Sequence, residues 1–240
     1  MERGAIIEFD VRTPLSRDGL RSNVAWALAE GFPEVESAPD RPETVNIIAN
    51  GPSALNAPQD GLTVALNGAH RLFRKAPTWW AACDPQGLVA DFVNRPFLET
   101  QYLVASKCDR RVFDALWGMD VRVWHIDDCE DVPWSVPSAT SITLTALSLF
   151  RRMGYRDFRV WGWDGCYVDG RDHAVPQLHS AERITVRVGG KSFETTPTWA
   201  AEAQDAVNQL AGADYRVRIE GDGMIKAVVG ALVPDCGLAA

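Results

Sequence analysis

The sequence predicts an α/β fold in which helices flank a parallel sheet. Short apolar runs recur along the middle of the chain, and most of them end in a polar or glycine residue. Segments with helical spacing separate several of these runs. The 240 residues, 46% hydrophobic and 23% charged, suit one large globular domain. Because strands that alternate with helices are typical of βαβ units, we expect a Rossmann-like sheet with right-handed crossovers.

The predicted elements follow in order along the chain. Residues 1–44 combine a polar opening, a helix over residues 20–29 and a linker rich in proline and glutamate over residues 33–42. Six apolar runs then predict strands at residues 45–49, 62–66, 78–83, 102–106, 121–126 and 158–163. Helices are predicted between them at residues 87–94, 109–117 and 141–153.

The helix at residues 141–153 has the clearest pattern, because apolar residues recur there every three or four positions and Gly154 stands where a C′ glycine belongs. After a loop over residues 165–180, the Gly189-Gly190 pair predicts the turn of a β-hairpin. A helix at residues 198–210 and a strand at 215–219 follow. We therefore divide the chain into a helix and linker (1–44), a Rossmann-like nucleotide-binding domain (45–180) and an appendage packed on it (181–240).

Composition excludes several classes of protein. No apolar run approaches the ~18 residues that a membrane helix needs, and the N-terminus lacks a secretory signal, so we expect a cytoplasmic protein without a membrane partner. Five cysteines stand singly, which predicts reduced thiols. The net charge of −8 opposes the phosphate backbone, so a nucleic-acid partner is not expected. Homo-oligomer formation is left open.

The first predicted strand ends in Asn50-Gly51-Pro52-Ser53. Gly51 lets the chain turn, Pro52 fixes φ, and Ser53 can cap a following helix. Backbone N–H groups at such a turn can face an anion, which predicts a phosphate site. The same four residues are equally consistent with an ordinary tight turn.

Polar residues also follow the other strands, notably Asn67-Gly68, Asp84-Pro85 and Asp164-Gly165. Ligands of open parallel sheets bind outside the carboxyl ends of the strands, so together these residues favour a nucleotide pocket over ordinary loops. Ser138, Thr140 and Ser141 precede the long helix and are predicted to form an anion seat, N-cap that helix, or both.

His173 lies in the loop that Asp164 feeds, and it is the candidate general base or acid; a surface histidine without a role is the alternative. His125 lies within an apolar strand and is predicted to be a core residue. No metal is firmly expected, although Asp84 and Asp164 could hold Mg²⁺. The nine tryptophans are mostly core by spacing, and one near Asp164 could stack on a base.

Known motifs narrow the function further. The chain lacks the P-loop, the G-x-G-x-x-G fingerprint and the G-x-S-x-G elbow. Its own motifs occur in the order Ile-Ile-Ala-Asn-Gly-Pro-Ser, Leu-Asn-Gly, Cys-Asp-Pro, Ser-Ile-Thr-Leu-Thr-Ala-Leu and Val-Trp-Gly-Trp-Asp. Over residues 45–180 this order resembles the 6-hydroxymethylpterin diphosphokinase MptE-like family, which includes bacterial motility accessory factors, and more distantly the small Rossmann-type bacterial sialyltransferases. The tail looks like that of small stand-alone members, some of them phage-encoded.

The resemblance implies a nucleotide or nucleotide-sugar ligand. Asn50, Gly51 and Ser53 match the family's phosphate-side loop, Asn67 the amide that contacts the nucleotide or donor, and Asp164 the acid that closes the Gly-x-Asp motif. In the sialyltransferases a histidine beyond this motif acts as the base, and His173 is similarly placed. The chain departs from them at Ala49, where they carry glycine.

Three functions remain open from the sequence. The first is glycosyl transfer from a nucleotide-activated sugar, with His173 as the base and Asp164 orienting the substrate. The second is Mg-ATP-dependent diphosphate transfer to a hydroxymethylpterin-like alcohol, with Asp84 and Asp164 holding the metal. The third is a nucleotide-binding module without catalytic activity.

Overall fold

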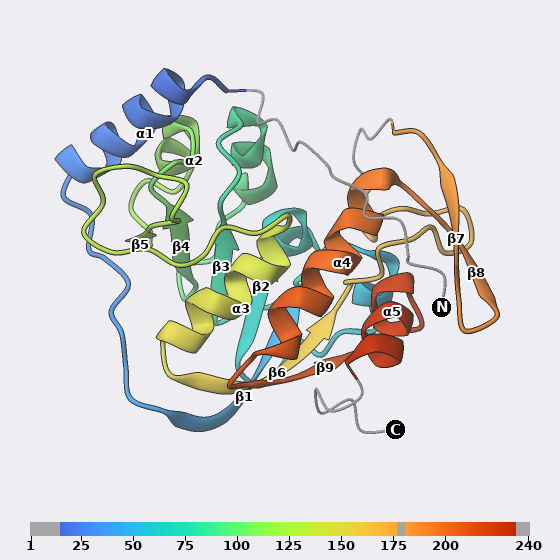
Figure 1. Ribbon diagram of the computed structural model, residues 1–240. Helices are drawn as coiled ribbons and strands as arrows, with labels where there is room; N and C mark the ends of the chain where they lie inside the picture. The colour runs from blue at the N-terminus through green and yellow to red at the C-terminus, as the bar shows by residue number, and fades with distance from the viewer. Residues whose placement is uncertain (1–14, 177–180, 234–240) are drawn as a thin grey trace.

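A seven-stranded parallel sheet forms the centre of the computed structural model, which describes residues 15–176 and 181–233. The strand order is β5-β4-β3-β2-β1-β6-β9, and every pairing in the sheet is parallel. Helices α3 and α4 lie side by side across the sheet, while α1 and α2 lie near its β5 end (Figure 1). The prediction of a Rossmann-like α/β fold is confirmed.

All six predicted strands form, with ends shifted by a few residues. The strands of the sheet are β1 (Arg41–Ile48), β2 (Thr63–Leu66), β3 (Trp79–Ala82), β4 (Gln101–Ala105), β5 (Asp120–Trp124), β6 (Tyr155–Trp161) and β9 (Arg216–Ile219). β1 starts earlier than predicted because its polar first residues also pair with β6, across an irregularity in register between Arg41 and Thr44. Polar residues at the start of a strand give no apolar signal.

The helices also lie close to the predicted segments. They are α1 (Arg17–Ala29), α2 (Arg110–Ala115), α3 (Ile142–Arg152), α4 (Pro197–Ala211) and α5 (Met224–Leu232), with 3₁₀ helices η1 (Pro52–Asn56), η2 (Asn67–Leu72) and η3 (Gly87–Val93). Gly154 follows the end of α3 with φ of 94°, as predicted. The sequence analysis did not predict α5, and it placed loops where η1 and η2 form.

The core confirms that the central strands are buried on both faces. Every residue of β2 and β3 is buried, as expected for strands between two layers of helices. His125 is fully buried, which confirms its assignment to the core. Four of the nine tryptophans are buried and four are partly buried against the core, whereas Trp117 is 88% exposed.

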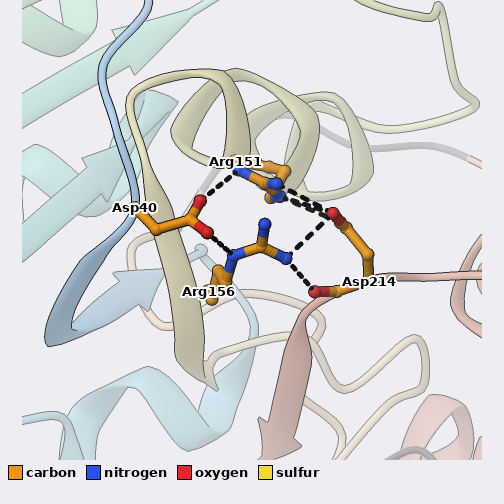
Figure 2. A network of polar contacts seen from close by, with 4 residues as sticks. All are labelled: Asp40, Arg151, Arg156 and Asp214. Atoms are coloured by element: carbon orange, nitrogen blue, oxygen red, sulfur yellow. Dashed lines mark hydrogen bonds and ion pairs between the residues drawn. The ribbon is translucent and has the colours of Figure 1, made fainter.

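The N-terminal edge of the sheet is held by a network of ion pairs (Figure 2). Arg151, near the end of α3, reaches both Asp40 before β1 and Asp214 before β9. Arg156 of β6 bridges the same two carboxylates, at 2.6 Å to Asp40 and 2.9 Å to Asp214. Three parts of the chain that are far apart in the sequence, around residues 40, 151–156 and 214, are thereby joined at this edge.

The C-terminal elements contribute to two sheets. β7 (Ile184–Val188) and β8 (Lys191–Thr195) form the predicted antiparallel hairpin. Gly189 and Gly190 have φ of 55° and 80°, the left-handed values that a type I′ turn requires. β9 is different, because it pairs with β6 and becomes the edge strand of the central sheet. The residues after 180 therefore contribute one strand, β9, to the central sheet, in addition to the separate hairpin of β7 and β8.

Cys83, Cys108, Cys129 and Cys166 are free thiols, whereas Cys236 and His179 lie outside the described residues. Of the helices in the described ranges, none has both the length and the apolar character needed to cross a membrane.

Candidate functional site

A crevice opens at the carboxyl edge of the sheet, where the strand order reverses. The chain passes from β1 outward to β5 and then returns to place β6 on the other side of β1. Such a switch point is the usual ligand site of an open α/β sheet. The crevice has a volume of about 170 Å³. The sequence-predicted residues that line it are Asn50, Gly51, Asn67, Ser141, Asp164 and His173.

Asp164 holds the first loop in place. Its Oδ2 accepts hydrogen bonds from the Ser53 N–H at 2.9 Å and the Ser53 hydroxyl at 3.0 Å. The Ser53 hydroxyl oxygen also accepts from the Gly162 N–H, and the Gly51 N–H donates to the Gly162 carbonyl. Two of the N–H groups that were expected to face an anion are therefore already bonded within the protein. Ser53 supports the crevice from behind and does not line it.

The same contacts explain why position 51 is glycine. A Cβ on Gly51 would lie 2.5 Å from both Asp164 Oδ2 and the Gly162 carbonyl oxygen. Asp164 is only 3% exposed, and burial raises the pKa of its carboxyl group while the bonds from Ser53 oppose that shift. Asp164 is thus a buried acid whose bonds join the loops after β1 and β6.

Asn50 fixes the loop that carries the candidate base. Its side-chain amide donates to the Val175 carbonyl at 3.2 Å and its carbonyl oxygen accepts from the Val175 N–H at 3.3 Å. The Asn50 backbone carbonyl also accepts from the Ala174 N–H. Because these three bonds go to the two residues that follow His173, they hold the backbone next to it beside the end of β1.

His173 lies in the crevice with 17% of its side chain exposed. Its Nδ1 lies 3.3 Å from the Asp172 carboxylate, and its ring packs edge-on to Trp199 with centroids 6.1 Å apart. A carboxylate beside Nδ1 favours the tautomer protonated at that nitrogen, which leaves Nε2 to accept a proton. The arrangement is suited to general base chemistry.

Asn67 presents an acceptor without a partner. It follows β2 with φ of 46°, a left-handed conformation that asparagine tolerates better than most residues. Its side-chain Oδ1 is buried and has no hydrogen-bond partner among the described residues. Such an atom is costly unless something bonds to it, so Asn67 is ready to receive a ligand donor. Neighbouring Gly68 is buried in η2 and does not line the crevice.

The predicted anion seat before α3 is largely occupied by carboxylates of the chain. The Thr140 N–H and hydroxyl both donate to Asp205 of α4, at 2.9 and 3.0 Å. The Ser138 N–H donates to Asp127. Ser141 caps α3 and lines the crevice together with the first turn of that helix. Of the three residues predicted to bind an anion, only Ser141 lines the crevice.

Three crevice residues escaped the sequence analysis: Asp172, Trp199 and Glu202. Glu202 is 8% exposed and its Oε1 accepts from the Trp163 indole N–H at 2.6 Å. Burial raises the pKa of the Glu202 carboxyl group, opposed by hydrogen bonds from Ser141 and Trp163. Along the sequence Glu202 is simply a charge on an amphipathic helix, and only the packing of α4 against the sheet brings it here.

Two tryptophans line the crevice near Asp164. Trp163 is only 3% exposed and its indole N–H is bonded to Glu202. Trp199, near the start of α4, is the more exposed of the two, and stacking on a base stays a prediction.

Asp84 lies apart from the crevice. Its carboxylate accepts from the Gln86 N–H in a local turn. β3 and β6 are three strand positions apart, so Asp84 and Asp164 are separated by about 14 Å at the usual interstrand distance. One Mg²⁺ ion cannot contact both. Within the described ranges, no three His, Cys, Asp or Glu side chains gather as a metal site would require.

The structure defines an α/β protein with a crevice at the switch point of its sheet. Neither a protein-family model nor a curated protein matches the chain. Among solved structures it is similar to the MAf glycosyltransferase of Magnetospirillum magneticum AMB-1, with a TM-score of 0.67 and 13% identity over 86% of this chain and 36% of that one.

A second similar structure is the sialyltransferase CstII of Campylobacter jejuni in complex with a substrate analogue, cytidine-5′-monophosphate. It has a TM-score of 0.46 and 11% identity over 84% of this chain and 88% of that one. The chain spans little more than a third of the length of MAf, and at 13% identity the likeness shows the shared fold alone. Membership of the MptE-like family stays a prediction.

Proposed function

We propose that the protein transfers a glycosyl group from a nucleotide-activated sugar to a hydroxyl acceptor. One observation carries the proposal: the crevice at the switch point brings an imidazole, an indole and two oxygen acceptors together, from His173, Trp199, Asn67 and Glu202. The similarity of the fold to that of MAf is in keeping with it.

The side-chain acceptors that line the crevice suit a sugar better than a diphosphate. Asn67 Oδ1 and the Glu202 carboxylate are acceptors, so they call for ligand groups that donate, such as sugar hydroxyls. Trp199 offers a flat apolar surface beside them. A volume of about 170 Å³ is below the usual size of a pocket for a whole drug-sized ligand, so the crevice encloses only part of the donor.

The phosphate of the donor then lies at the start of α3. Ile142 and Thr143 of its first turn line the crevice, and first-turn N–H groups have no partners within a helix. The helix dipole also favours negative charge at this end. This position would stabilise the charge that develops on the leaving phosphate.

In the reaction, Nε2 of His173 takes the proton of the acceptor hydroxyl as its oxygen bonds to the anomeric carbon. The bond between that carbon and the phosphate oxygen breaks, and the nucleotide leaves with the electron pair. Asp172 orients the imidazole and stabilises its protonated form. Asn50 positions the base, and Asp164 acts through Ser53 to keep the first loop in shape.

The diphosphokinase alternative finds no support in the geometry, because Asp84 and Asp164 cannot share an ion. Mg²⁺ bound to the phosphates of the substrate alone is compatible with either reaction. A non-catalytic module would have no need of a paired Asp172 and His173 in its crevice.

The test is a thermal-shift screen of CMP-, UDP-, GDP- and dTDP-sugars, ATP and pterins, with and without Mg²⁺. We expect one nucleotide-sugar to raise the melting temperature and to release its nucleotide when a suitable acceptor is added. Stabilisation only by ATP with Mg²⁺ and a pterin would favour the diphosphokinase. A flat screen would contradict both enzyme functions.

A further inference from the structure

A second cavity lies away from the crevice and is lined by arginines. It has a volume of about 550 Å³. Arg71, Arg74 and Arg95 line it together with Phe73 and Phe97. We refer to it as the arginine cavity.

The charges of the arginine cavity are not neutralised by the chain. In the described part of the sequence, Arg71, Arg74 and Arg95 form no ion pair, unlike other exposed arginines such as Arg110 with Asp114 and Arg183 with Glu194. Three such guanidinium groups around one cavity are notable in a chain of net charge −8. Guanidinium groups bind phosphate and carboxylate through paired hydrogen bonds.

The loops that carry these arginines are held by hydrogen bonds to neighbouring segments. Gln59 accepts from the Arg74 N–H at 3.2 Å and donates to the Leu72 carbonyl. The Phe97 N–H donates to the Tyr102 hydroxyl at 2.7 Å, which fixes the segment after Arg95. Arg71 is itself positioned, because it donates to the Asp91 carbonyl and lies over the Phe92 ring.

The floor of the arginine cavity is uncharged. His70 is 3% exposed, and burial together with the charge of Arg71 lowers the pKa of its imidazole to about 4. At neutral pH the positive charge of the cavity therefore comes from the arginines alone. The rings of Phe73 and Phe97 add apolar surface beneath them.

We propose that the arginine cavity is a binding site for a small anion, a phosphate-bearing or acidic-sugar molecule, separate from the crevice. The site lies at the far end of η2 from Asn67, roughly 10 Å away at the usual rise of a 3₁₀ helix. A ligand there leaves the crevice open.

The experiment measures binding by calorimetry on the full chain, with pyrophosphate and glucuronate as separate probes. The variant Arg71→Gln/Arg74→Gln/Arg95→Gln removes the three charges of the cavity. The control Arg110→Gln/Arg122→Gln/Arg183→Gln removes three exposed arginines that have carboxylate partners, so both variants change the net charge equally. Circular dichroism checks that both fold.

We expect the native chain and the control to bind the probe with the same affinity. The cavity variant should bind it at least about tenfold more weakly. Tighter binding of pyrophosphate identifies the ligand as a phosphate ester, and tighter binding of glucuronate as an acidic sugar. The proposal is overturned if native protein binds neither probe at millimolar concentration. Equal losses in both variants, or native-like binding by the cavity variant, would assign any binding to general charge or to the crevice.

Discussion

At the scale of single residues, His173 is the side chain on which the proposed chemistry depends. Replacing it by alanine should reduce glycosyl transfer by about 10²- to 10⁴-fold, the usual contribution of a general base. Donor binding should change little, because the backbone of this loop is held by Asn50. Transfer rates and donor melting shifts, measured on the same preparations, separate the two effects. An alanine variant as active as the native protein would exclude His173 as the base.

The second prediction concerns Glu202, whose replacement by glutamine should preserve or raise stability and weaken donor binding. Burial raises its pKa in the folded state, so the contribution of this group to stability is lost as the pH rises through that pKa. Glu202→Gln keeps an acceptor for Trp163 without the charge. We expect it to be as stable as the native chain or more so, by up to about 1 kcal/mol, at pH 8.

The advantage of Glu202→Gln should shrink on acidification, and donor binding should weaken at both pH values. Urea unfolding at pH 5 and pH 8 measures the first effect, and titration with the donor measures the second. A variant that unfolds more readily at pH 8 and binds the donor normally would show that Glu202 is only structural.

Among the residues that line the crevice, sequence reasoning identified those that follow strands directly. Asn50, Asn67 and Asp164 occupy strand ends, and parallel strands bring their ends to one edge of the sheet. It could not find Glu202 or Trp199, because only tertiary packing carries α4 to that edge. It also assigned the N–H groups of the first loop to a ligand, although Asp164 and the Gly162 carbonyl accept them. The acceptor of a loop N–H group is often supplied by a residue that is distant in the sequence, so the local sequence does not identify it.

At the scale of elements, the turn after β1 tolerates no side chain at position 51. Gly51→Ala should destabilise the protein by about 1–3 kcal/mol, because the added methyl group meets two oxygen atoms that have no room to move. Gly212→Ala is the matched control, since a Cβ there meets nothing within 4 Å. Urea unfolding of both variants tests this. Equal stability would mean that the loops after β1 and β6 can separate without cost.

The strands were easier to predict than the 3₁₀ helices and α5. Buried strands such as β2 and β3 are apolar throughout, so the composition of the segment alone identifies them. The short 3₁₀ helices lack a repeating pattern, and α5 is too uniformly apolar to show which of its faces is buried. Both depend on packing that the local sequence does not encode.

At the scale of the whole molecule, the ion pairs of Figure 2 connect the N-terminal edge of the sheet. Arg151 beside Asp214 lowers the pKa of that carboxyl group from 3.8 to about 2. Its contribution to stability is therefore present above about pH 4 and is lost as the pH falls toward 2. Because Asp214 is 58% exposed, we expect no more than about 1 kcal/mol.

Asp214→Asn should accordingly lower the free energy of unfolding at pH 7 by up to about 1 kcal/mol, with the difference from the native chain vanishing near pH 2. Denaturant unfolding across this range provides the measurement. Asp114→Asn, which removes a lone exposed pair with Arg110, serves as the comparison and should have a smaller effect. A difference that persists unchanged at pH 2 would assign the effect to something other than the charge.

The fold class could be predicted from the alternation of strands and helices along the whole chain. This prediction does not depend on the exact residues at which each element begins and ends. The expectation of a crevice at the carboxyl edge followed from the same rule, and the crevice lies beside β1, where the strand order reverses. The identity of the ligand does not follow from topology, because it depends on a few acceptors and on how they are paired.

The central claim is that this crevice binds a nucleotide-activated sugar against His173. The most direct measurement is a crystal structure of the His173→Ala variant with the nucleotide-sugar that the thermal-shift screen selects. We predict the sugar between Asn67 and Glu202, its anomeric carbon facing position 173 and its phosphate at the start of α3. A donor found elsewhere on the surface, with the crevice still open, would contradict the account.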